Sequence, residues 1–462
     1  MAHRHGSEPA MITGTVLIAG AGVSGRGIVR LLERLGVDFT VADDNNLSTG
    51  VTVAEARTVL SRFSLVVTSP GWRPDNPLLV DAAAAGLEVI GDVELAYRLD
   101  RAGAFGPPRT WLVVTGTNGK TTTTAMLAAM MAQLGQDTGL RARAVGNIGV
   151  AVADALLDEQ RVDVLVAELS SFQLHWSKEL IPDAGVLLNL AEDHIDWHGS
   201  FTSYADAKGR ALSGSVAVAG VDDPVVRAVL ARADVDNHIG FTLAEPGVGQ
   251  FGLIGGQLVD NTGDAPVILA PVAGIQPAGP AGVLDALAAA AIARSQGATP
   301  EHIAAALAAF QVDGHRGQII AETGGVTWVD NSKATNPHAA DAALAGLDNV
   351  IWLAGGQLKG ADIVPLIRSH AHRLKAVGLL GADAPRIAAA MAEHAPHVPV
   401  HHTTRTDPEQ AIAELVGWAA DTAGAGDTVL LAPAAASLDM FTGMAQRGDL
   451  FAAAANQPRE IS

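Results

Sequence analysis

The feature that most constrains the fold is the stretch of residues 115–122, which reads T-G-T-N-G-K-T-T. The apolar, β-branched run Trp111 to Val114 precedes it and predicts a buried strand, while the apolar spacing of Thr123 to Leu134 predicts a helix closed by Gly135. A strand, a glycine turn and a helix form a phosphate cradle, because the helix N-terminus adds partial positive charge to the backbone N–H groups. We therefore predict a nucleotide-binding loop.

Individual residues of this loop fit polyphosphate chemistry. Gly116 and Gly119 lack the β-carbon that would keep a phosphate off the backbone, Lys120 can reach the β- and γ-phosphates, and the Thr121 hydroxyl can ligate magnesium. The general motif has its first glycine where this chain has Val114, so the loop is a shortened variant. The alternative is a glycine-rich turn with an unrelated lysine. The position of the loop between a strand and a helix favours nucleotide binding.

Length and composition exclude several classes of protein. The chain has 462 residues, enough for about three domains of ordinary size. Its formal charge of −19 argues against a nucleic-acid partner, because affinity for nucleic acid comes mostly from clustered Lys and Arg. The lack of cysteine excludes disulfides, thiolate catalysis and zinc–thiolate sites.

No targeting or membrane segment is evident in the sequence. The first 13 residues carry His3, Arg4 and His5 but no apolar core of signal-peptide length, and no later run reaches membrane-spanning length without a charge. We therefore expect a soluble, cytoplasmic monomer that binds small molecules, without nucleic acid and without membrane insertion.

The predicted N-terminal domain, residues 1–106, begins with a second glycine-rich turn. Gly20 to Gly25 reads G-x-G-x-x-G, follows the apolar run Val16 to Ala19 and opens a helical stretch. Asp43 follows the next strand, about where an acid that binds a ribose would lie. A dinucleotide site is the direct interpretation, and close packing of a helix on a strand is the alternative. Either way, the pattern predicts a Rossmann-like parallel α/β domain.

The predicted central domain, residues 107–312, starts after a linker at Gly103 to Arg109 and contains the phosphate loop. Glu168 ends an apolar strand, and the next strand runs into residues 189–198, which are rich in acids and histidines. Carboxylates at the carboxyl ends of parallel strands, in a domain with a phosphate loop, suit magnesium. The alternative for residues 189–198 is a solvated loop. Lys208 lies in a helical stretch and, taken by itself, is predicted to lie on the surface.

The predicted C-terminal domain, residues 313–462, begins where the pattern resets near Asp313 to Gly317. Strands again alternate with helices, and polar clusters follow the strands, as at Asp330 to Asn336 and at Ser437 to Asp439. The carboxyl edge of a doubly wound sheet is where such folds bind ligands. Scattered histidines show no pattern of partners and are predicted to lie on the surface: His370, His372, His401 and His402.

Taken together, the motifs closely resemble those of the Mur ligases, from about Val16 to Gly448. They are the G-T-N-G-K-T loop, E-L-S-S-F-Q-L from Glu168, N-L-A-E-D-H from Asn189, the Y-x-x-x-K of Tyr204 and Lys208, His315-Arg316, D-N-S-K-A-T-N from Asp330 and A-S-L-D from Ala436. The S-K-A-T-N segment is the most discriminating, because it resembles the members of the family that add D-glutamate.

The resemblance implies three α/β domains: a Rossmann-like domain for a UDP-sugar, a central P-loop-type mononucleotide-binding ATPase domain and a Rossmann-like C-terminal domain for an amino acid. It also implies a reaction. ATP phosphorylates the L-alanyl carboxylate of UDP-N-acetylmuramoyl-L-alanine, and the amine of D-glutamate attacks the acyl phosphate, giving ADP and phosphate in peptidoglycan precursor synthesis. Domain closure is expected to assemble the site.

The resemblance assigns roles to individual residues of this chain. The catalytic residues would be Lys120, Glu168, His194 and Lys208. Two Mg²⁺ ions would be held by Thr121, Glu168, His194 and, if it is carbamylated, Lys208. ATP would contact Gly116, Thr117, Asn118, Gly119, Lys120, Thr121, Thr122, Arg316 and Asp330. The UDP-sugar would contact Val23, Ser24, Asp43, Gly71, Asn147, Ser170 and Gln173. D-Glutamate would contact Lys333, Thr335, Lys359, Ser437 and Leu438.

Some positions depart from the family pattern. Asn45 stands where an Arg often lies near uracil, Asp285 stands where an Asn that holds adenine is expected, and Met444 replaces an aromatic residue near the glutamate. Three other interpretations are possible. The chain could be an NAD-dependent oxidoreductase, suggested by the first glycine motif, a folylpolyglutamate synthetase, or a nucleotide-dependent binding protein without catalysis.

Overall fold

The computed structural model describes residues 12–45, 50–147, 149–233, 235, 238–312 and 314–457. His3, Arg4, His5 and Asp313, named above, lie outside the described residues. The chain divides into two compact units, Met1–Ala273 with Leu284–Ala309, and Gly274–Val283 with Phe310–Ser462. Within the described part of the chain, no helix is long and apolar enough to cross a membrane.

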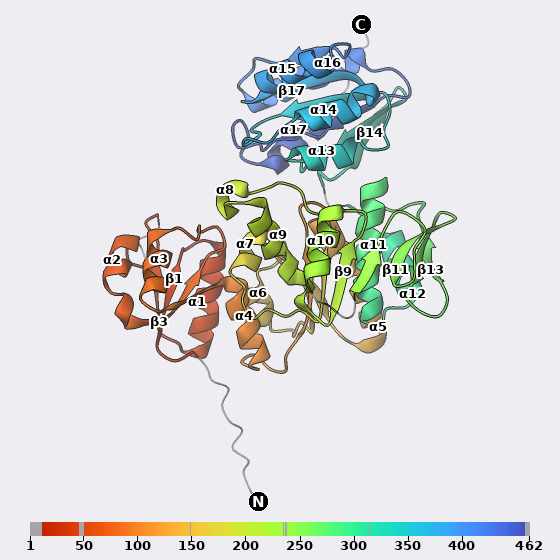
Figure 1. The fold of residues 1–462 in the computed structure, drawn as a ribbon. Helices are drawn as coiled ribbons and strands as arrows, with labels where there is room; N and C mark the ends of the chain where they lie inside the picture. The colour runs from red at the N-terminus through yellow and green to blue at the C-terminus, as the bar shows by residue number, and fades with distance from the viewer. Residues whose placement is uncertain are drawn as a thin grey trace, which may run out of the picture. The chain divides into compact units, whose positions relative to one another are not determined.

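The N-terminal part of the first unit is a four-stranded parallel sheet in the order β2-β1-β3-β4. Its elements are β1 Thr15–Ala19, α1 Val23–Leu35, β2 Phe39–Ala42, α2 Val53–Thr58, η1 Leu60–Arg62, β3 Phe63–Thr68, α3 Pro77–Ala84, β4 Glu88–Gly91 and α4 Asp92–Arg101 (Figure 1). The strands are short runs of buried apolar residues, as parallel strands covered on both faces require.

The central part of the first unit is a nine-stranded sheet in the order β13-β12-β11-β10-β9-β8-β5-β7-β6. Its strands are β5 Thr110–Thr115, β6 Ala142–Gly146, β7 Val164–Glu168, β8 Ala184–Leu187, β9 Val216–Gly220, β10 His238–Phe241, β11 Gln250–Ile254, β12 Gln257–Asn261 and β13 Val267–Pro271. The last two strands pair antiparallel and the others pair parallel. Strand β5 therefore lies between β7 and β8, and their carboxyl ends share one edge.

Helices cover this sheet. They are α5 Lys120–Thr138, α6 Val152–Leu156, α7 Ser171–His175, α8 Ile195–His198, α9 Phe201–Gly209, η2 Arg210–Ser213, α10 Pro224–Arg232, α11 Pro280–Ser295 and α12 Pro300–Ala309. Helix α5 is longer than predicted, because it passes through Gly135 and ends at Gly139, whose φ is 76°. A β-carbon at Gly135 would lie 2.4 Å from the carbonyl oxygen of Leu140, so this glycine serves close packing inside the helix and does not end it.

The second unit is a six-stranded sheet in the order β14-β15-β19-β16-β17-β18, parallel except for the β14–β15 pair. Its elements are β14 Gln318–Thr323, β15 Val326–Asp330, α13 Pro337–Leu344, β16 Val350–Gly355, α14 Val364–His370, η3 Ala371–Arg373, β17 Leu374–Leu380, α15 Ala384–His394, β18 Val400–His402, α16 Pro408–Thr422, β19 Thr428–Leu431 and α17 Met444–Ala455.

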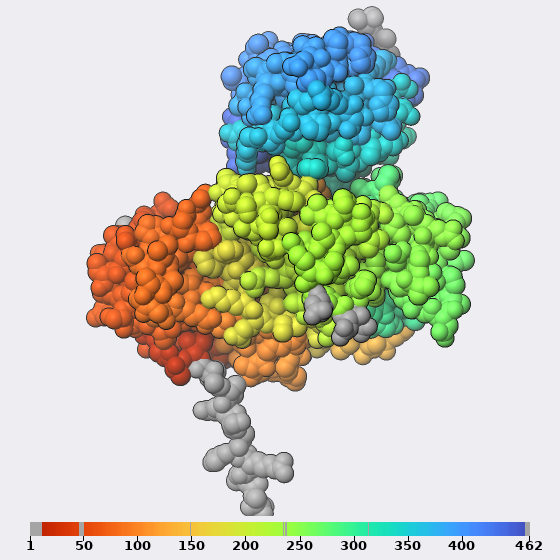
Figure 2. Space-filling model, viewed as in Figure 1, coloured from red at the N-terminus to blue at the C-terminus, as the bar shows by residue number. Residues whose placement is uncertain are grey.

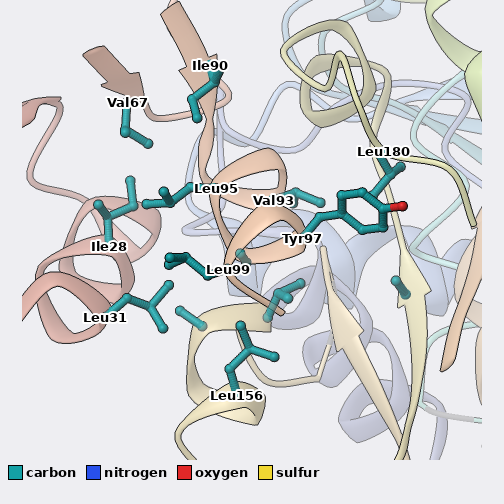
Figure 3. Packing of buried hydrophobic residues seen from close by; sticks show 14 of the residues in the cluster. Ile28, Leu31, Val67, Ile90, Val93, Leu95, Tyr97, Leu99, Leu156 and Leu180 are labelled. Carbon is teal, nitrogen blue, oxygen red and sulfur yellow. The ribbon is translucent and has the colours of Figure 1, made fainter. Parts of the chain in front are cut away.

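Helix α4 joins the two sheets of the first unit through one apolar core. Figure 3 shows Ile28 of α1, Val67 of β3, Leu156 of α6 and Leu180 packed around the side chains of α4. The Tyr97 hydroxyl of α4 donates to the carbonyl of Ile181 at 3.1 Å. Figure 2 shows the surfaces of these two parts in contact on the face that it draws.

The predicted linker after α4 ends in a buried ion pair. Arg109, 3% exposed, bonds Asp100 through Nη1 at 2.7 Å, and the Trp111 indole donates to the same carboxylate at 2.9 Å. Loss of either charge would leave the other buried without compensation, which costs several kcal/mol, about 3–5. This ion pair and the hydrogen bond from Trp111 thus fix the connection between the first two sheets. The exact domain boundaries, 1–106 and 107–312, stay predictions.

Candidate active site

The phosphate loop follows β5 as predicted, and glycine is required at two of its positions. A β-carbon at Gly116 would lie 2.8 Å from the Leu188 side chain, and Gly119 has a φ of 82°, in the left-handed region that favours glycine. Gly119 is also the N-cap of α5 and, as a glycine, has no side chain to cap that helix end. The N-terminus of α5 therefore directs its partial positive charge toward the loop, where it favours an anionic ligand.

Side chains from two neighbouring segments hold the loop in this shape. Asn189 accepts from the Asn118 N–H at 2.8 Å and donates back to the Asn118 carbonyl at 3.1 Å. The Tyr204 hydroxyl of α9 lies 2.8 Å from the Thr117 hydroxyl. Both residues belong to motifs of the sequence, but the motifs alone assign them no role at the site. Their local sequence indicates only that the two side chains are polar. Their role in supporting the phosphate loop depends on the fold.

The amine of Lys120 lies over the loop. Its Nζ donates to the carbonyls of Gly116 at 3.0 Å and of Thr117 at 2.7 Å. The next two side chains of α5, Thr121 and Thr122, are 8% and 6% exposed. A lysine on a flexible stem can exchange carbonyl oxygens for phosphate oxygens at little cost, so the cation is already placed beside the glycine turn.

Glu168 ends β7, the strand beside the loop, where it pairs in register with Val114 of β5. Its carboxylate is buried, and Oε1 accepts from Asn147 Nδ2 at 2.8 Å. Oε2 is also buried and has no hydrogen-bond partner among the described residues. A buried carboxylate oxygen without a partner is costly unless something binds it, which fits a hard cation such as Mg²⁺.

His194 takes an unusual backbone conformation in the loop after β8. Its φ is 52°, which is uncommon for a residue other than glycine, and its ring packs edge-on against Phe172 at 4.7 Å between centroids. Burial lowers the pKa of His194, although Asp193, 3.5 Å away, acts in the opposite direction. A neutral imidazole is the form that can coordinate a metal.

Lys208 contradicts the prediction that it lies on the surface. Its α9 helix turns it inward, so that it is 2% exposed and its Nζ donates to the Gly116 carbonyl at 2.6 Å and the Thr115 hydroxyl at 3.3 Å. Burial lowers the pKa of Lys208 well below its usual value, and Lys120 lowers it further. The structure thus places a buried amine directly beneath the phosphate loop.

The residues predicted to hold the UDP-sugar lie at the carboxyl edges of the first two sheets. Asp43 accepts from the Ala21 N–H of the first glycine turn at 2.7 Å, and Asn147 contacts Glu168 as described. Ser170 and Gln173 form a capping box at the start of α7, with bonds of 2.9 and 3.2 Å. These two side chains therefore have a structural role, whatever they bind.

The same edge joins the N-terminal part to the loop of His194. The Trp197 indole donates to the Gly71 carbonyl at 3.3 Å, and Arg73 Nη1 donates to the Asp196 carbonyl at 2.8 Å. Of the other predicted sugar contacts, Val23 is 67% exposed at the start of α1, beside Ser24. The structure thus brings Gly71 close to the predicted metal loop.

In the second unit, three loops at one sheet edge carry the residues predicted for D-glutamate. The Ala434 N–H donates to the Ala334 carbonyl at 2.9 Å, between Lys333 and Thr335. Gln357 and Ala436 exchange two backbone bonds of 2.8 and 2.9 Å, which places the loop of Lys359 beside that of Ser437 and Leu438. Leu438 is 69% exposed and Ser437 is buried.

Asp330, a predicted ATP contact, is fully buried at the end of β15. One carboxylate oxygen lies 2.6 Å from Nδ1 of His315 and the other accepts from the Ser332 N–H at 2.9 Å. A β-carbon at Gly448 of α17 would lie 2.0 Å from the same imidazole, so glycine is needed for α17 to pack there. The carboxylate thereby fixes the loop of Lys333 and the segment of Arg316.

Arg447 is a residue that the sequence analysis missed. It is fully buried in α17, and it donates to the Ser332 hydroxyl at 3.0 Å, to the Ser332 carbonyl at 2.9 Å, and to the carbonyls of Gly355 and Ala435 at 3.3 Å. Burial lowers its pKa to about 10. One guanidinium thus ties together the three loops that carry the predicted D-glutamate contacts. An arginine in a helix near the end of a chain gives no local sign of this role.

We expect Arg447→Lys to raise the KM for D-glutamate by about tenfold or more, with little change in the KM for ATP, because an ammonium cannot reach three loops at once. Lost bonds to a charged group should also lower the free energy of unfolding by about 2–3 kcal/mol. Steady-state kinetics and denaturant unfolding measure both effects. Arg373→Lys is the control, since Arg373 contacts one carbonyl and the exposed Asp348. Equal changes in the two variants would contradict this role.

One of the histidines predicted to lie on the surface is buried. His370 is 6% exposed and its Nε2 lies 2.8 Å from Asp341 of α13. His401 lies 3.0 Å from Glu414 and stacks on Trp418. These partners lie between 13 and 29 residues away along the chain, so the sequence did not reveal them.

The fold is similar to that of a solved structure over almost the whole chain. A crystal structure of MurF from Acinetobacter baumannii matches with a TM-score of 0.59 at 17% sequence identity, covering 98% of this chain and 92% of that one. At this level of sequence identity, the similarity is evidence for the fold only. It agrees with three α/β domains, as predicted.

Comparison of sequences is more specific. Residues 114–249 match the Mur ligase middle domain, and residues 315–435 match the Mur ligase, glutamate ligase domain. The UDP-N-acetylmuramoylalanine--D-glutamate ligase of Corynebacterium efficiens is 60% identical over 456 residues, 96% of this chain and 95% of that protein. The protein of the same name from Corynebacterium diphtheriae is 57% identical over 461 residues, 96% of each chain. The chain therefore belongs to the Mur ligase family and groups there with the UDP-N-acetylmuramoylalanine--D-glutamate ligases.

Proposed function

We propose that this protein is an ATP-dependent amide-bond ligase that joins D-glutamate to UDP-N-acetylmuramoyl-L-alanine. The observation that carries the proposal is the phosphate loop with Lys120 beside the buried, partly unpaired carboxylate of Glu168, in a chain 60% identical to a ligase of that name. The reaction belongs to the cytoplasmic stage of peptidoglycan precursor synthesis, where substrates are still carried on UDP.

The chemistry requires two displacements. A carboxylate is a poor acylating agent, so an oxygen of the L-alanyl carboxylate first attacks the γ-phosphorus of ATP. The bond from that phosphorus to the β,γ-bridging oxygen breaks, and ADP leaves. The amine of D-glutamate then attacks the acyl carbon, loses a proton, and inorganic phosphate leaves with the acyl oxygen. Both steps bring anions together, so positive charge and fixed orientation supply most of the catalysis.

The residues of the loop have distinct parts in the first step. The N–H groups at the start of α5 and the Lys120 amine hold the phosphates and offset the charge of the transferred group. Thr121, Glu168 and His194 would hold Mg²⁺, which when bound offsets phosphate charge and orients the oxygens. Among the described residues, no group of three or more His, Asp or Glu is arranged to hold a metal alone, so phosphate oxygens would complete the coordination.

Lys208 is proposed to be carbamylated. A neutral amine adds CO₂ and loses a proton, giving a carbamate whose oxygens are anionic, and the burial of Lys208 favours the neutral amine. The modification would turn a buried donor beneath the loop into an oxygen ligand for a second Mg²⁺.

The second unit is proposed to hold D-glutamate. Its two carboxylates would be offset by Lys333 and Lys359, while Thr335 and Ser437 donate hydrogen bonds and Leu438 covers the side-chain methylenes. Arg316 and Asp330 would contact ATP. In the first unit, the UDP-sugar would lie along Val23, Ser24, Asp43, Gly71, Asn147, Ser170 and Gln173.

The test is reconstitution. Purified protein, ATP, Mg²⁺ and UDP-N-acetylmuramoyl-L-alanine are mixed with D-glutamate, L-glutamate, L-alanine or L-lysine in parallel, and ADP and product mass are measured. We expect one new amide, with D-glutamate only, and one ADP for each amide formed. A mixture that yields neither ADP nor a heavier conjugate would refute the function. Binding of NADH would instead support the oxidoreductase alternative.

Lys333→Ala is expected to raise the KM for D-glutamate at least about tenfold and to leave ATP affinity within about twofold, because the variant removes one cation from the amino-acid loop. Steady-state rates with each substrate varied give the comparison. Lys375→Ala is the control, as Lys375 pairs with Asp427 at the far end of a strand. An unchanged dependence on D-glutamate would remove Lys333 from that site.

A further inference from the structure

Asp285 of α11 lies directly against the phosphate loop. The residue is 7% exposed, and its Oδ1 accepts from the Thr123 hydroxyl, in the first turn of α5, at 3.1 Å. A β-carbon at Gly119 would lie 2.2 Å from the same oxygen and 3.4 Å from Oδ2. The carboxylate therefore packs on the α-carbon of the glycine that caps α5.

This position gives Asp285 an electrostatic effect on the loop. The N-terminus of a helix attracts anions, and a fixed carboxylate there satisfies part of that attraction before any ligand arrives. Because the same loop is the proposed phosphate site, a bound polyphosphate has the Asp285 charge close by, in a partly buried place where water screens weakly. The resemblance to the Mur ligases leads one to expect a neutral asparagine at this position.

Asp285 also lines a small cavity. The cavity has a volume of about 80 Å³ and lies next to the loop, because Asn189, which bonds Asn118, is in its wall as well. Among its other lining residues are Phe241, Asp222 and Leu284. If a nucleotide base occupied this cavity, Asp285 would also act through a hydrogen bond to that base.

We propose that Asp285 lowers the affinity of the phosphate loop for nucleotide polyphosphates through its negative charge. The inference rests on the proposed nucleotide binding by that loop. ATP and ADP are then both held less tightly than by the loop with a neutral residue in the same place. The effect does not depend on the base, since the charge acts on the phosphates.

The test is the dissociation constant of ATP, ADP and GTP, each with Mg²⁺, for the full chain and for Asp285→Asn. The asparagine keeps the size of the side chain and an oxygen that accepts from Thr123. We expect all three nucleotides to bind about three- to tenfold more tightly to the variant. Thermal unfolding shows whether the variant is folded. If it is not, Asp285→Ser gives the same comparison.

Asp222→Asn is the matched control. Asp222 lines the same cavity, but its oxygens accept from the Thr242 hydroxyl at 2.6 Å and the Leu243 N–H at 2.9 Å, away from the loop, so we expect no change beyond twofold. A gain for ATP and ADP but not for GTP would assign Asp285 to the base and overturn the proposal, as would unchanged or weaker binding. This test measures binding and not catalysis. A protein that binds ATP but forms no amide would therefore refute the proposed function and leave the proposal about Asp285 standing.

Discussion

Lys120→Ala is expected to lower the rate of amide formation by about a hundred- to a thousandfold and to leave the protein folded. The side chain donates to two loop carbonyls, both within four residues along the chain, so its removal disturbs little packing. In the transition state, however, its charge faces the transferred phosphoryl group, where one preorganised donor supplies about 2.7–4 kcal/mol. The measurement is single-turnover formation of ADP and of product, with circular dichroism to check the fold.

The matched control for Lys120 is Lys178→Ala. Lys178 lies in the same unit, half-exposed, and its nearest acid is Glu88 at 4.0 Å. An exposed pair at that distance contributes little to stability and nothing to the site, so the control should turn over at the wild-type rate. A folded Lys120→Ala variant within tenfold of the control would exclude the loop from the mechanism.

The phosphate loop could be predicted from sequence because its determinants are local. The strand, the glycine turn and the lysine lie within 12 consecutive residues, from Trp111 to Thr122, and each residue type has a physical reason to be there. The same holds for Glu168, since an acid at the end of an apolar run needs only the strand to be placed at the sheet edge. The family comparison then favours the ligase interpretation over the oxidoreductase interpretation of the first glycine turn.

The contributions of Lys208, Arg447 and Asp285 could not be predicted in this way. Lys208 looks like a surface residue until α9 is seen to turn it under the loop, 92 residues away along the chain. Arg447 contacts residues between 12 and 115 positions away, and Asp285 meets Thr123 across 162 positions. Helix periodicity shows which residues share a face, but which face meets which loop is decided by the whole fold.

Substitution of Lys208 by Met is expected to lower the rate by at least about a hundredfold, with a smaller effect on ATP affinity. Methionine nearly fills the space of the lysine stem without burying an unpaired charge, so the fold should survive. It cannot add CO₂, and the oxygen ligand proposed for the second Mg²⁺ is lost. Initial rates, measured over a range of Mg²⁺ concentrations, should show that the variant no longer responds to high Mg²⁺.

Carbamylation of Lys208 can also be tested in the wild-type protein, through its dependence on CO₂ and pH. Carbamylation needs the uncharged amine, and the pKa of Lys208 is lowered by burial, so the amine is available at a lower pH than for an exposed lysine. We expect activity to fall when CO₂ and bicarbonate are removed, to return when they are added, and to decline as the pH falls through the lowered pKa. A carbamate signal from ¹³C-labelled CO₂ should be present in the wild type and in Lys178→Met but absent in Lys208→Met. Full activity without CO₂ would mean that the buried amine needs no modification and serves as a hydrogen-bond donor to the Gly116 carbonyl. Full activity of Lys208→Met would mean that the reaction does not require this amine.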